Sequence, residues 1–274
     1  MAIHFNRKPG LVVYLTAGDP SLDATRAIAI AAIDAGAEVI ELGVPFSDPL
    51  ADGPVIQRAM ERALARGAGL KGIGLRDVLA LAGEIRAARP QAGLVIFTYL
   101  NPILRYGMSK FADDAAAAGA DGVLVTDLIV EEAGEYVAEM ARVGLAPIFL
   151  AAPTSPDERL EAIATHSKGF IYAISRVGIT GTQQSLTGDA AALVGRIRRF
   201  SGPAGAGLPV AVGFGISNSE HVAQVGRFAD AAVIGSAIVE LIERATIEGG
   251  AETAPGAVAR FIKGLRPPEA ALAR

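Results

Sequence analysis

The sequence of 274 residues contains no cysteine and no tryptophan, and only three of its residues are histidines. The absence of cysteine excludes disulfides, thiolate metal sites and cysteine nucleophiles. His4, His166 and His221 stand far apart, with no second ligand at metal-binding spacing, so we expect no metal site. The net charge of −4 provides no basic face, and we therefore expect no binding to nucleic acid or to an anionic membrane.

Long apolar runs are also absent, which excludes a transmembrane helix of the usual length. Arg7 and Lys8 precede the apolar run Leu11–Leu15, an arrangement that faintly resembles a signal peptide. The run breaks at Thr16 and Gly18, and no small-residue cleavage site follows it. We therefore expect a cytoplasmic protein.

What the sequence does contain is an alternation of short apolar runs with longer amphipathic stretches. The apolar runs are typical of parallel strands that are covered on both faces. The expected strands are Leu11–Thr16, Val39–Gly43, Leu94–Tyr99, Gly122–Thr126, Pro147–Ala151, Gly169–Ile174, Pro209–Gly213 and Ala231–Gly235. The expected helices are Ala24–Ala35, Val55–Ala65, Leu75–Ala88, Ser109–Ala118, Glu131–Arg142, Asp157–His166, Ala190–Phe200, Asn218–Val225 and Ile238–Glu243.

Eight strands that alternate with helices predict an α/β fold, a single (β/α)8 (TIM) barrel with extra helices. A doubly wound open sheet is the alternative, which the strand number alone does not exclude. No linker divides the chain, so we expect one catalytic barrel domain over residues 1–265 and a frayed tail over residues 266–274.

The second expected strand carries a carboxylate, Glu41. Side chains alternate along a strand, so Glu41 shares a face with Val39 and Gly43 while the apolar neighbours pack under the helices. This turns Glu41 into the barrel near the carboxyl end of its strand, where barrel active sites lie. A structural ion pair is the other interpretation, with Arg176 as the nearest candidate cation. Without a cation, burial raises the pKa of Glu41 and favours a role in proton transfer.

Asp52 follows in a loop that is rich in proline and glycine. It is a candidate functional carboxylate, but an N-cap of the next helix or a turn residue are equally compatible with its position. Asp48 competes with Asp52 for each of these roles.

Two glycine-containing turns follow the seventh and eighth expected strands, at Gly213–Ser217 and Ile234–Ala237. Barrel enzymes often bind phosphate there, through backbone N–H groups and a helix N-terminus, although glycine also serves ordinary tight turns. The polar, glycine-rich segment Ser175–Thr187 follows the sixth strand and is longer than most such loops. It is a candidate lid, and a disordered loop is the alternative.

With these motifs in place, the sequence resembles the tryptophan synthase alpha chain family from about residue 11 to residue 265. The most specific motif is the fourteen-residue block ELGVPFSDPLADGP that begins at Glu41. The other matching motifs, in the order of the family, are Thr16–Pro20, Thr98–Pro102, Ala152–Thr154, Arg176–Gly181, Gly213–Ser217 and Ile234–Ser236.

The resemblance implies reversible retro-aldol cleavage of indole-3-glycerol phosphate to indole and glyceraldehyde 3-phosphate. Glu41 matches the general acid–base of the family, and Asp52 matches the residue that accepts the indole N–H. Thr180 matches the lid residue that orients Asp52.

The remaining positions that the resemblance assigns contact the substrate. Its phosphate-binding positions match Gly181, Gly215, Gly235 and Ser236, and its aromatic pocket positions match Tyr14 and Tyr172. It implies no metal and no cofactor in this subunit, since pyridoxal phosphate is expected only in a beta subunit, with which the chain is expected to form an alpha2beta2 heterotetramer.

Three features depart from the family pattern. Only about ten residues precede the first strand, so we expect a shortened N-terminal segment. Ile129 stands where proline is usual, near the expected contact with the beta subunit, and the C-terminal tail is long. Three other functions stay open: a stand-alone lyase, a non-catalytic barrel that only activates a beta subunit, and a generic phosphosugar barrel enzyme.

Overall fold

Nine parallel strands form a single sheet in a computed structural model, which describes residues 3–65, 72–174, 183–202, 207–213 and 215–266. The strands are β1 (Gly10–Thr16), β2 (Val39–Gly43), β3 (Gly93–Thr98), β4 (Gly122–Val125), β5 (Ala146–Ile148), β6 (Leu150–Ala151), β7 (Ile171–Ile174), β8 (Val210–Gly213) and β9 (Ala231–Ile234). Their order in the sheet is β5-β4-β3-β2-β1-β9-β8-β7-β6.

The two ends of this order belong to one extended segment, because only Phe149 separates β5 from β6. The carbonyl of Pro147, within β5, accepts a hydrogen bond from Lys168 N at 2.8 Å, and the Phe149 carbonyl accepts one from Tyr172 N at 3.1 Å. The sheet therefore closes into the predicted eight-stranded barrel, and the doubly wound alternative is wrong.

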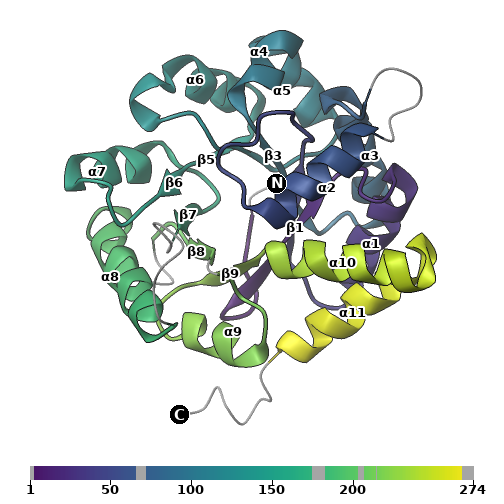
Figure 1. Cartoon of the computed structure of the whole chain (residues 1–274). Coiled ribbons are helices and arrows are strands. Elements are labelled where there is room, and N and C mark those ends of the chain that lie inside the picture. The colour runs from purple at the N-terminus through teal and green to yellow at the C-terminus, as the bar shows by residue number, and fades with distance from the viewer. Residues whose placement is uncertain (1–2, 66–71, 175–182, 203–206, 214, 267–274) are drawn as a thin grey trace.

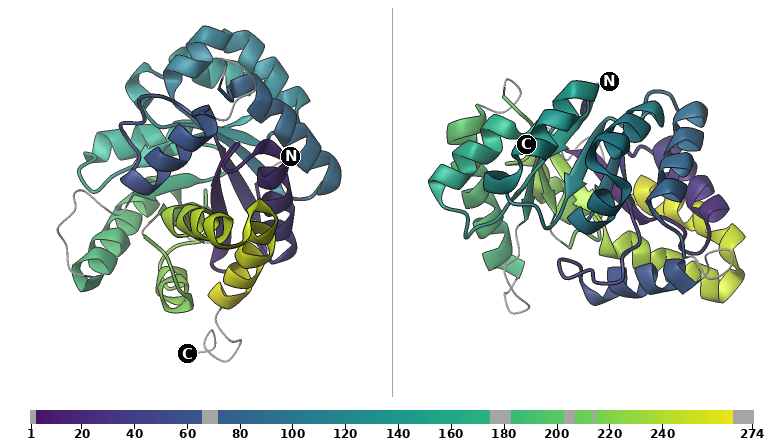
Figure 2. Two further views of the ribbon diagram at one scale, coloured as in Figure 1. Left: turned by 45° about the vertical axis from the view of Figure 1, so that its right-hand side comes forward. Right: turned by 90° about the horizontal axis from the view of Figure 1, so that it is seen from above.

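The helices form a ring around the strands (Figure 1). They are α1 (Leu22–Asp34), α2 (Pro54–Ala65), α3 (Leu75–Ala88), α4 (Leu100–Tyr106), α5 (Met108–Ala117), α6 (Gly134–Val143), α7 (Asp157–His166), α8 (Gln183–Ser201), α9 (Ser219–Gly226), α10 (Ser236–Gly249) and α11 (Ala254–Leu265), with 3-10 turns η1 (Val130–Glu132) and η2 (Ala251–Thr253). Each predicted helix is present, and α4 and α11 are the extra helices that the sequence pattern did not locate. Figure 2 shows α2 at one end of the barrel, outside the ring.

The barrel has two apolar cores, one on each face of the sheet. Val39 of β2 belongs to the inner cluster, whereas Ile40 and Leu42 belong to the outer cluster beneath the helices. This alternation is the predicted one, and it turns Glu41 inward.

Side chains of the N-terminal segment close the barrel floor, and no helix lies within residues 3–9. Ile3 packs into the inner cluster, and the Phe5 ring lies 6.0 Å from that of Phe170 in an edge-to-face contact. Residues 3–9 therefore cover the floor with two side chains.

At the other end of the chain, Arg266 donates hydrogen bonds to the carbonyls of Pro9 and Gly36. The first residue of the expected tail is thus anchored, and residues 267–274 lie outside the described residues. Within the described part of the chain, no helix is long and apolar enough to cross a membrane, and no cluster of candidate ligands could hold a metal ion.

Candidate active site

Glu41 lies at the centre of the barrel mouth with its side chain completely buried. In the register of the sheet it stands between Tyr14 of β1 and Val95 of β3. Neither carboxyl oxygen has a hydrogen-bond partner among the described residues. Burial raises the pKa of Glu41 to about 8, because the charged form loses its hydration without gaining a compensating contact. Arg176, the candidate ion-pair partner, lies outside the described residues.

Asp52 is half-buried in the loop between β2 and α2. Its carboxylate accepts a hydrogen bond of 2.7 Å from the Tyr99 hydroxyl, and its backbone carbonyl accepts one from Gln57 Nε2. Burial raises the pKa of Asp52, and the bond from Tyr99 partly offsets this. The contact of the carboxylate is therefore with a residue that follows the neighbouring strand β3. The competing Asp48 is exposed and accepts a bond from the adjacent Ser47.

Tyr99 is a site residue to which the sequence reasoning assigned no role. It follows β3 and is the N-cap residue of α4. Its ring stacks on Phe46 at a centroid distance of 5.0 Å, and its hydroxyl accepts a hydrogen bond from Ala51 N. Tyr99 thus holds both the backbone and the carboxylate of the Asp52 loop. Its motif, TYLNP, belongs to the resemblance, but nothing in the spacing indicates the contact.

Two tyrosines flank Glu41, and each occupies space that a glycine on the neighbouring strand leaves open. A Cβ on Gly43 would lie 2.2 Å from the Tyr14 hydroxyl oxygen, and a Cβ on Gly213 would lie 2.4 Å from that of Tyr172. Burial and the negative charge of both carboxylates raise the pKa of each tyrosine. The two hydroxyls therefore lie close to the carboxylates, as expected for walls of a shared pocket.

Phe97 of β3 also belongs to this wall, although the sequence reasoning did not single it out. Its ring meets that of Tyr14 edge-to-face at 5.1 Å.

The glycines of the predicted phosphate-binding turns, here called the phosphate cradle (Gly215, Gly235 and Ser236), lie after β8 and β9. Gly215 has a φ of +53°, and nothing lies within 4 Å of the position that its Cβ would take. Gly235 is the N-cap residue of α10, and the exposed Ser236 begins this helix. Backbone N–H groups at such a helix start suit an anion. Thr180, Gly181 and the rest of the loop 175–182 lie outside the described residues.

The fold and the site together define a (β/α)8-barrel protein with a carboxyl group buried, without a hydrogen-bond partner among the described residues, toward the carboxyl ends of its strands, where barrel enzymes carry out their chemistry.

The comparison with known families identifies the chain more closely. The model of the family described as tryptophan synthase alpha chain matches residues 2–261. A tryptophan synthase alpha chain of Solibacter usitatus is 52% identical over 239 residues, which cover 87% of this chain and 85% of the relative. The corresponding protein of Bordetella bronchiseptica is 46% identical over 246 residues, or 90% of this chain and 83% of the relative.

Solved structures agree. Tryptophan synthase subunit alpha of Legionella pneumophila superposes with a TM-score of 0.84 at 36% identity and covers 97% of this chain and 94% of its own. A chain from the tryptophan synthase alpha2beta2 complex of Pyrococcus furiosus gives a TM-score of 0.81 at 37% identity and covers 94% and 98%. The chain belongs to the tryptophan synthase alpha chain family. It is a lyase of tryptophan biosynthesis that cleaves indole-3-glycerol phosphate.

Proposed function

We propose that the cleavage takes place at the barrel mouth, with Glu41 as the general acid–base and Asp52 as the residue that binds the indole N–H. The observation that carries this proposal is the complete burial of Glu41 without a hydrogen-bond partner among the described residues. A carboxyl group with a pKa of about 8 is protonated at neutral pH, so it can act as an acid there.

The protons balance within a single carboxyl group. Neutral Glu41 donates its proton to the indole ring carbon that bears the glycerol phosphate chain, and the ring becomes cationic. The bond between this carbon and the chain then breaks, and its electron pair restores the aromatic ring. The adjacent hydroxyl loses its proton to the Glu41 carboxylate and becomes the aldehyde of glyceraldehyde 3-phosphate. Glu41 ends the cycle protonated.

Asp52 acts on the charge that this protonation creates. Positive charge develops on the ring nitrogen, and a carboxylate that accepts the N–H stabilises it most strongly at that stage. The Tyr99 hydroxyl holds one Asp52 oxygen at 2.7 Å and leaves the other for the substrate. Tyr14 and Tyr172 supply the walls against which the ring packs.

The phosphate group is expected at the backbone of Gly215 and Gly235 and at Ser236, where the start of α10 offers N–H groups. Thr180 and Gly181 keep the roles that the resemblance implies, as lid residue and phosphate contact. We expect this subunit to need no cofactor of its own and to work in the cytoplasm.

We also propose that a tryptophan synthase beta subunit, which would carry pyridoxal phosphate, binds this chain in an alpha2beta2 assembly. The name of the Pyrococcus furiosus structure describes mutual activation in such a complex. Leu50, Leu104 and Ile129 are 93%, 57% and 46% exposed, and they follow the adjacent strands β2, β3 and β4. Exposed large apolar side chains that follow adjacent strands of a barrel are compatible with a protein interface.

Indole release by the purified chain, alone and with an added beta subunit, tests the proposal. We expect Glu41→Gln to lower the rate by about 1,000-fold, within the usual range for loss of a general acid–base. The control is Glu84→Gln, which makes the same change on an exposed helix face. Near-normal turnover of Glu41→Gln would overturn the acid–base assignment.

The same assay separates the alternatives. High activity that an added beta subunit does not change would indicate a stand-alone lyase. Activation of the beta subunit by a wild-type chain that releases no indole itself would indicate a non-catalytic barrel.

A further inference from the structure

Two helices begin at opposite ends of the proposed substrate site. Asp52 lies two residues before α2, and Gly235 and Ser236 begin α10. The two helices pack side by side at the barrel mouth (Figure 1). The distance between the indole end and the phosphate end of the site therefore depends on how α2 is held against α10.

The contact between the two helices is apolar where it is closest to the site. Ala59 of α2, Val239 of α10 and Tyr14 of β1 form a small buried cluster, with Ile56 packed against it. The position that a Cβ on Gly235 would take lies 3.9 Å from both Ile56 and Tyr14. Apolar contacts of this kind are not directional, so they permit small shifts of one helix along the other.

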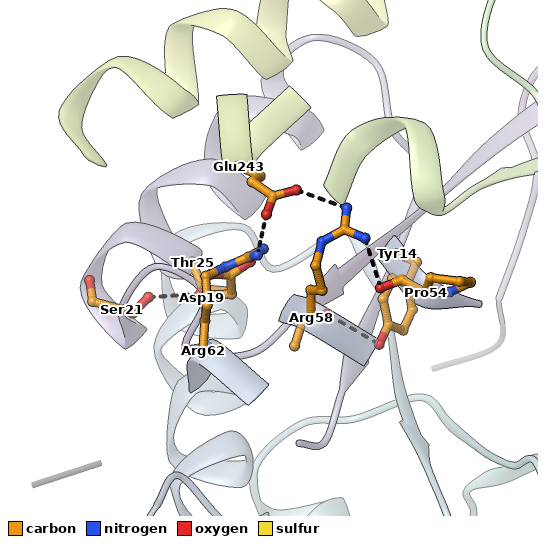
Figure 3. A network of polar contacts seen from close by, with 10 residues as sticks. Tyr14, Asp19, Ser21, Thr25, Pro54, Arg58, Arg62 and Glu243 are labelled. Atoms are coloured by element: carbon orange, nitrogen blue, oxygen red, sulfur yellow. Dashed lines mark hydrogen bonds and ion pairs between the residues drawn. The ribbon is translucent and has the colours of Figure 1, made fainter. Parts of the chain in front are cut away.

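Farther from the site, an ionic network joins the same two helices (Figure 3). Glu243 of α10 accepts hydrogen bonds from Arg62 at 2.5 Å and from Arg58 at 3.2 Å, and both arginines belong to α2. Arg58 also donates to the carbonyl of Pro54, the first residue of α2, at 3.4 Å. Arg62 donates two hydrogen bonds, of 2.9 and 2.7 Å, to the carboxylate of Asp19 in the turn after β1.

Burial makes the Asp19–Arg62–Glu243 part of this network stiffer than ordinary surface pairs, whereas Arg58 is 49% exposed. The side chain of Asp19 is 4% exposed, that of Glu243 22% and that of Arg62 26%. Arg62 is therefore fixed to the barrel through a two-point contact with Asp19, and Glu243 binds to an arginine that is already held in place. Such directional contacts fix the position of α10 along α2, which the apolar cluster alone does not determine.

We propose that Glu243 is a positioning residue: through Arg58 and Arg62 it fixes the distance between Asp52 and the phosphate cradle at the start of α10. This inference rests on the proposed function, which places the two ends of the substrate at these helix starts. A ligand that occupies both ends gains affinity only if their spacing matches its length, because its second contact is then intramolecular. A ligand that occupies one end gains nothing from the spacing.

The test compares three ligands in wild-type protein and in Glu243→Gln. Indole fills one end of the site and glycerol 3-phosphate the other. An indole joined to phosphate by a saturated three-carbon chain spans both and cannot be cleaved. The control variant, Glu248→Gln, makes the same change in an exposed residue of the same helix. Dissociation constants come from NMR titrations of the purified chain.

We expect Glu243→Gln to weaken binding of the two-ended ligand by about 10-fold and binding of each half by less than 2-fold, whereas Glu248→Gln leaves all three unchanged. A uniform loss for all three ligands would overturn the proposal, because it would indicate general loosening of the fold. Unchanged binding of the two-ended ligand would also overturn it. If the halves fail to compete with the two-ended ligand in wild-type protein, the proposed site itself is wrong, and that result is distinct from the other two.

Discussion

The floor and the mouth of the barrel both bury carboxylates, but the two at the floor each pair with an arginine, whereas Glu41 at the mouth pairs with none among the described residues. Asp121 precedes β4 at the floor, where it pairs with Arg86 and accepts a hydrogen bond from the backbone N–H of Leu94 at 2.9 Å. Glu41 lies at the mouth with neither oxygen hydrogen-bonded within the described part of the chain. An ionised carboxylate is costly to bury without a partner, and this cost supports the proton-transfer role that we propose for Glu41.

The floor repeats its arrangement on the other side of the barrel. Asp230 precedes β9, pairs with Arg198 and accepts a hydrogen bond from the N–H of Val210, the first residue of β8. Each aspartate thus ties the start of one strand to a helix and to the start of the neighbouring strand that precedes it in the chain. These carboxylates are part of the scaffold that holds the strands in register, whereas Glu41 at the mouth is the carboxyl group for which we propose a chemical role.

The largest expected effect concerns Glu41, whose loss should stabilise the protein. Its folded pKa of about 8 exceeds the ordinary value of 4.5, so the folded state holds more protons than the unfolded state between these values. The contribution of Glu41 to stability is therefore greatest below pH 4.5 and is lost as the pH rises from there through 8. Relative to Glu41→Gln, which stays neutral, we expect the wild-type protein to be less stable by about 3 kcal/mol at pH 7.

Urea unfolding of both proteins at pH 5, 7 and 9 measures this difference. The two curves should nearly coincide at pH 5 and separate progressively as the pH rises. Equal free energies of unfolding at all three pH values would mean that the charge of Glu41 has a compensating partner in the folded protein. The carboxylates of the floor and the mouth would then not differ in this respect.

The opposite result is expected at the floor. Asp121→Ala leaves Arg86 and the N–H of Leu94 without their shared acceptor, so we expect a loss of about 3 kcal/mol in the free energy of unfolding. Indole release per folded molecule should stay within about 2-fold of wild type, since the change lies at the far end of the barrel. Asp230→Ala serves as the matched variant and should behave alike. A large loss of turnover in both folded variants would contradict the division of roles.

A smaller effect is expected at Tyr99, which links the mouth to the scaffold. Tyr99→Phe removes the donor to Asp52 and the acceptor of Ala51 N–H. We expect kcat/KM to fall about 10-fold, which is the loss of roughly one hydrogen bond to a charged group. Tyr106→Phe removes a similar hydroxyl that donates to Asp114 on the surface, and it should leave kcat/KM unchanged. Equal behaviour of the two variants would show that Asp52 needs no such support.

The barrel and the inward direction of Glu41 could be predicted because both depend on local patterns. Apolar runs such as Val39–Gly43 and the alternation along a strand are properties of neighbouring residues. Helix α4 was missed because its seven residues begin directly after β3 and carry too short a pattern. Helix α11 was missed because no strand follows it in the alternation.

The contacts that organise the mouth could not be predicted in this way. Tyr99 and Asp52 are 47 residues apart, and Arg62 and Glu243 are 181 apart. Their partners are decided by the pairing of β2 with β3 and by the packing of α2 against α10, which bring distant segments together. The function of Asp52 was accordingly indicated by the resemblance more than by its spacing, which a cap or a turn explained equally well.

A titration of the Glu41 carboxyl group tests the central claim most directly. The difference between the infrared spectra of wild-type protein and Glu41→Gln isolates the carbonyl band of this one group. We expect the band of a protonated carboxylic acid to be present at pH 7 and to disappear with a midpoint near pH 8. A group that is already ionised at pH 7, with a midpoint near 4.5, would contradict the account.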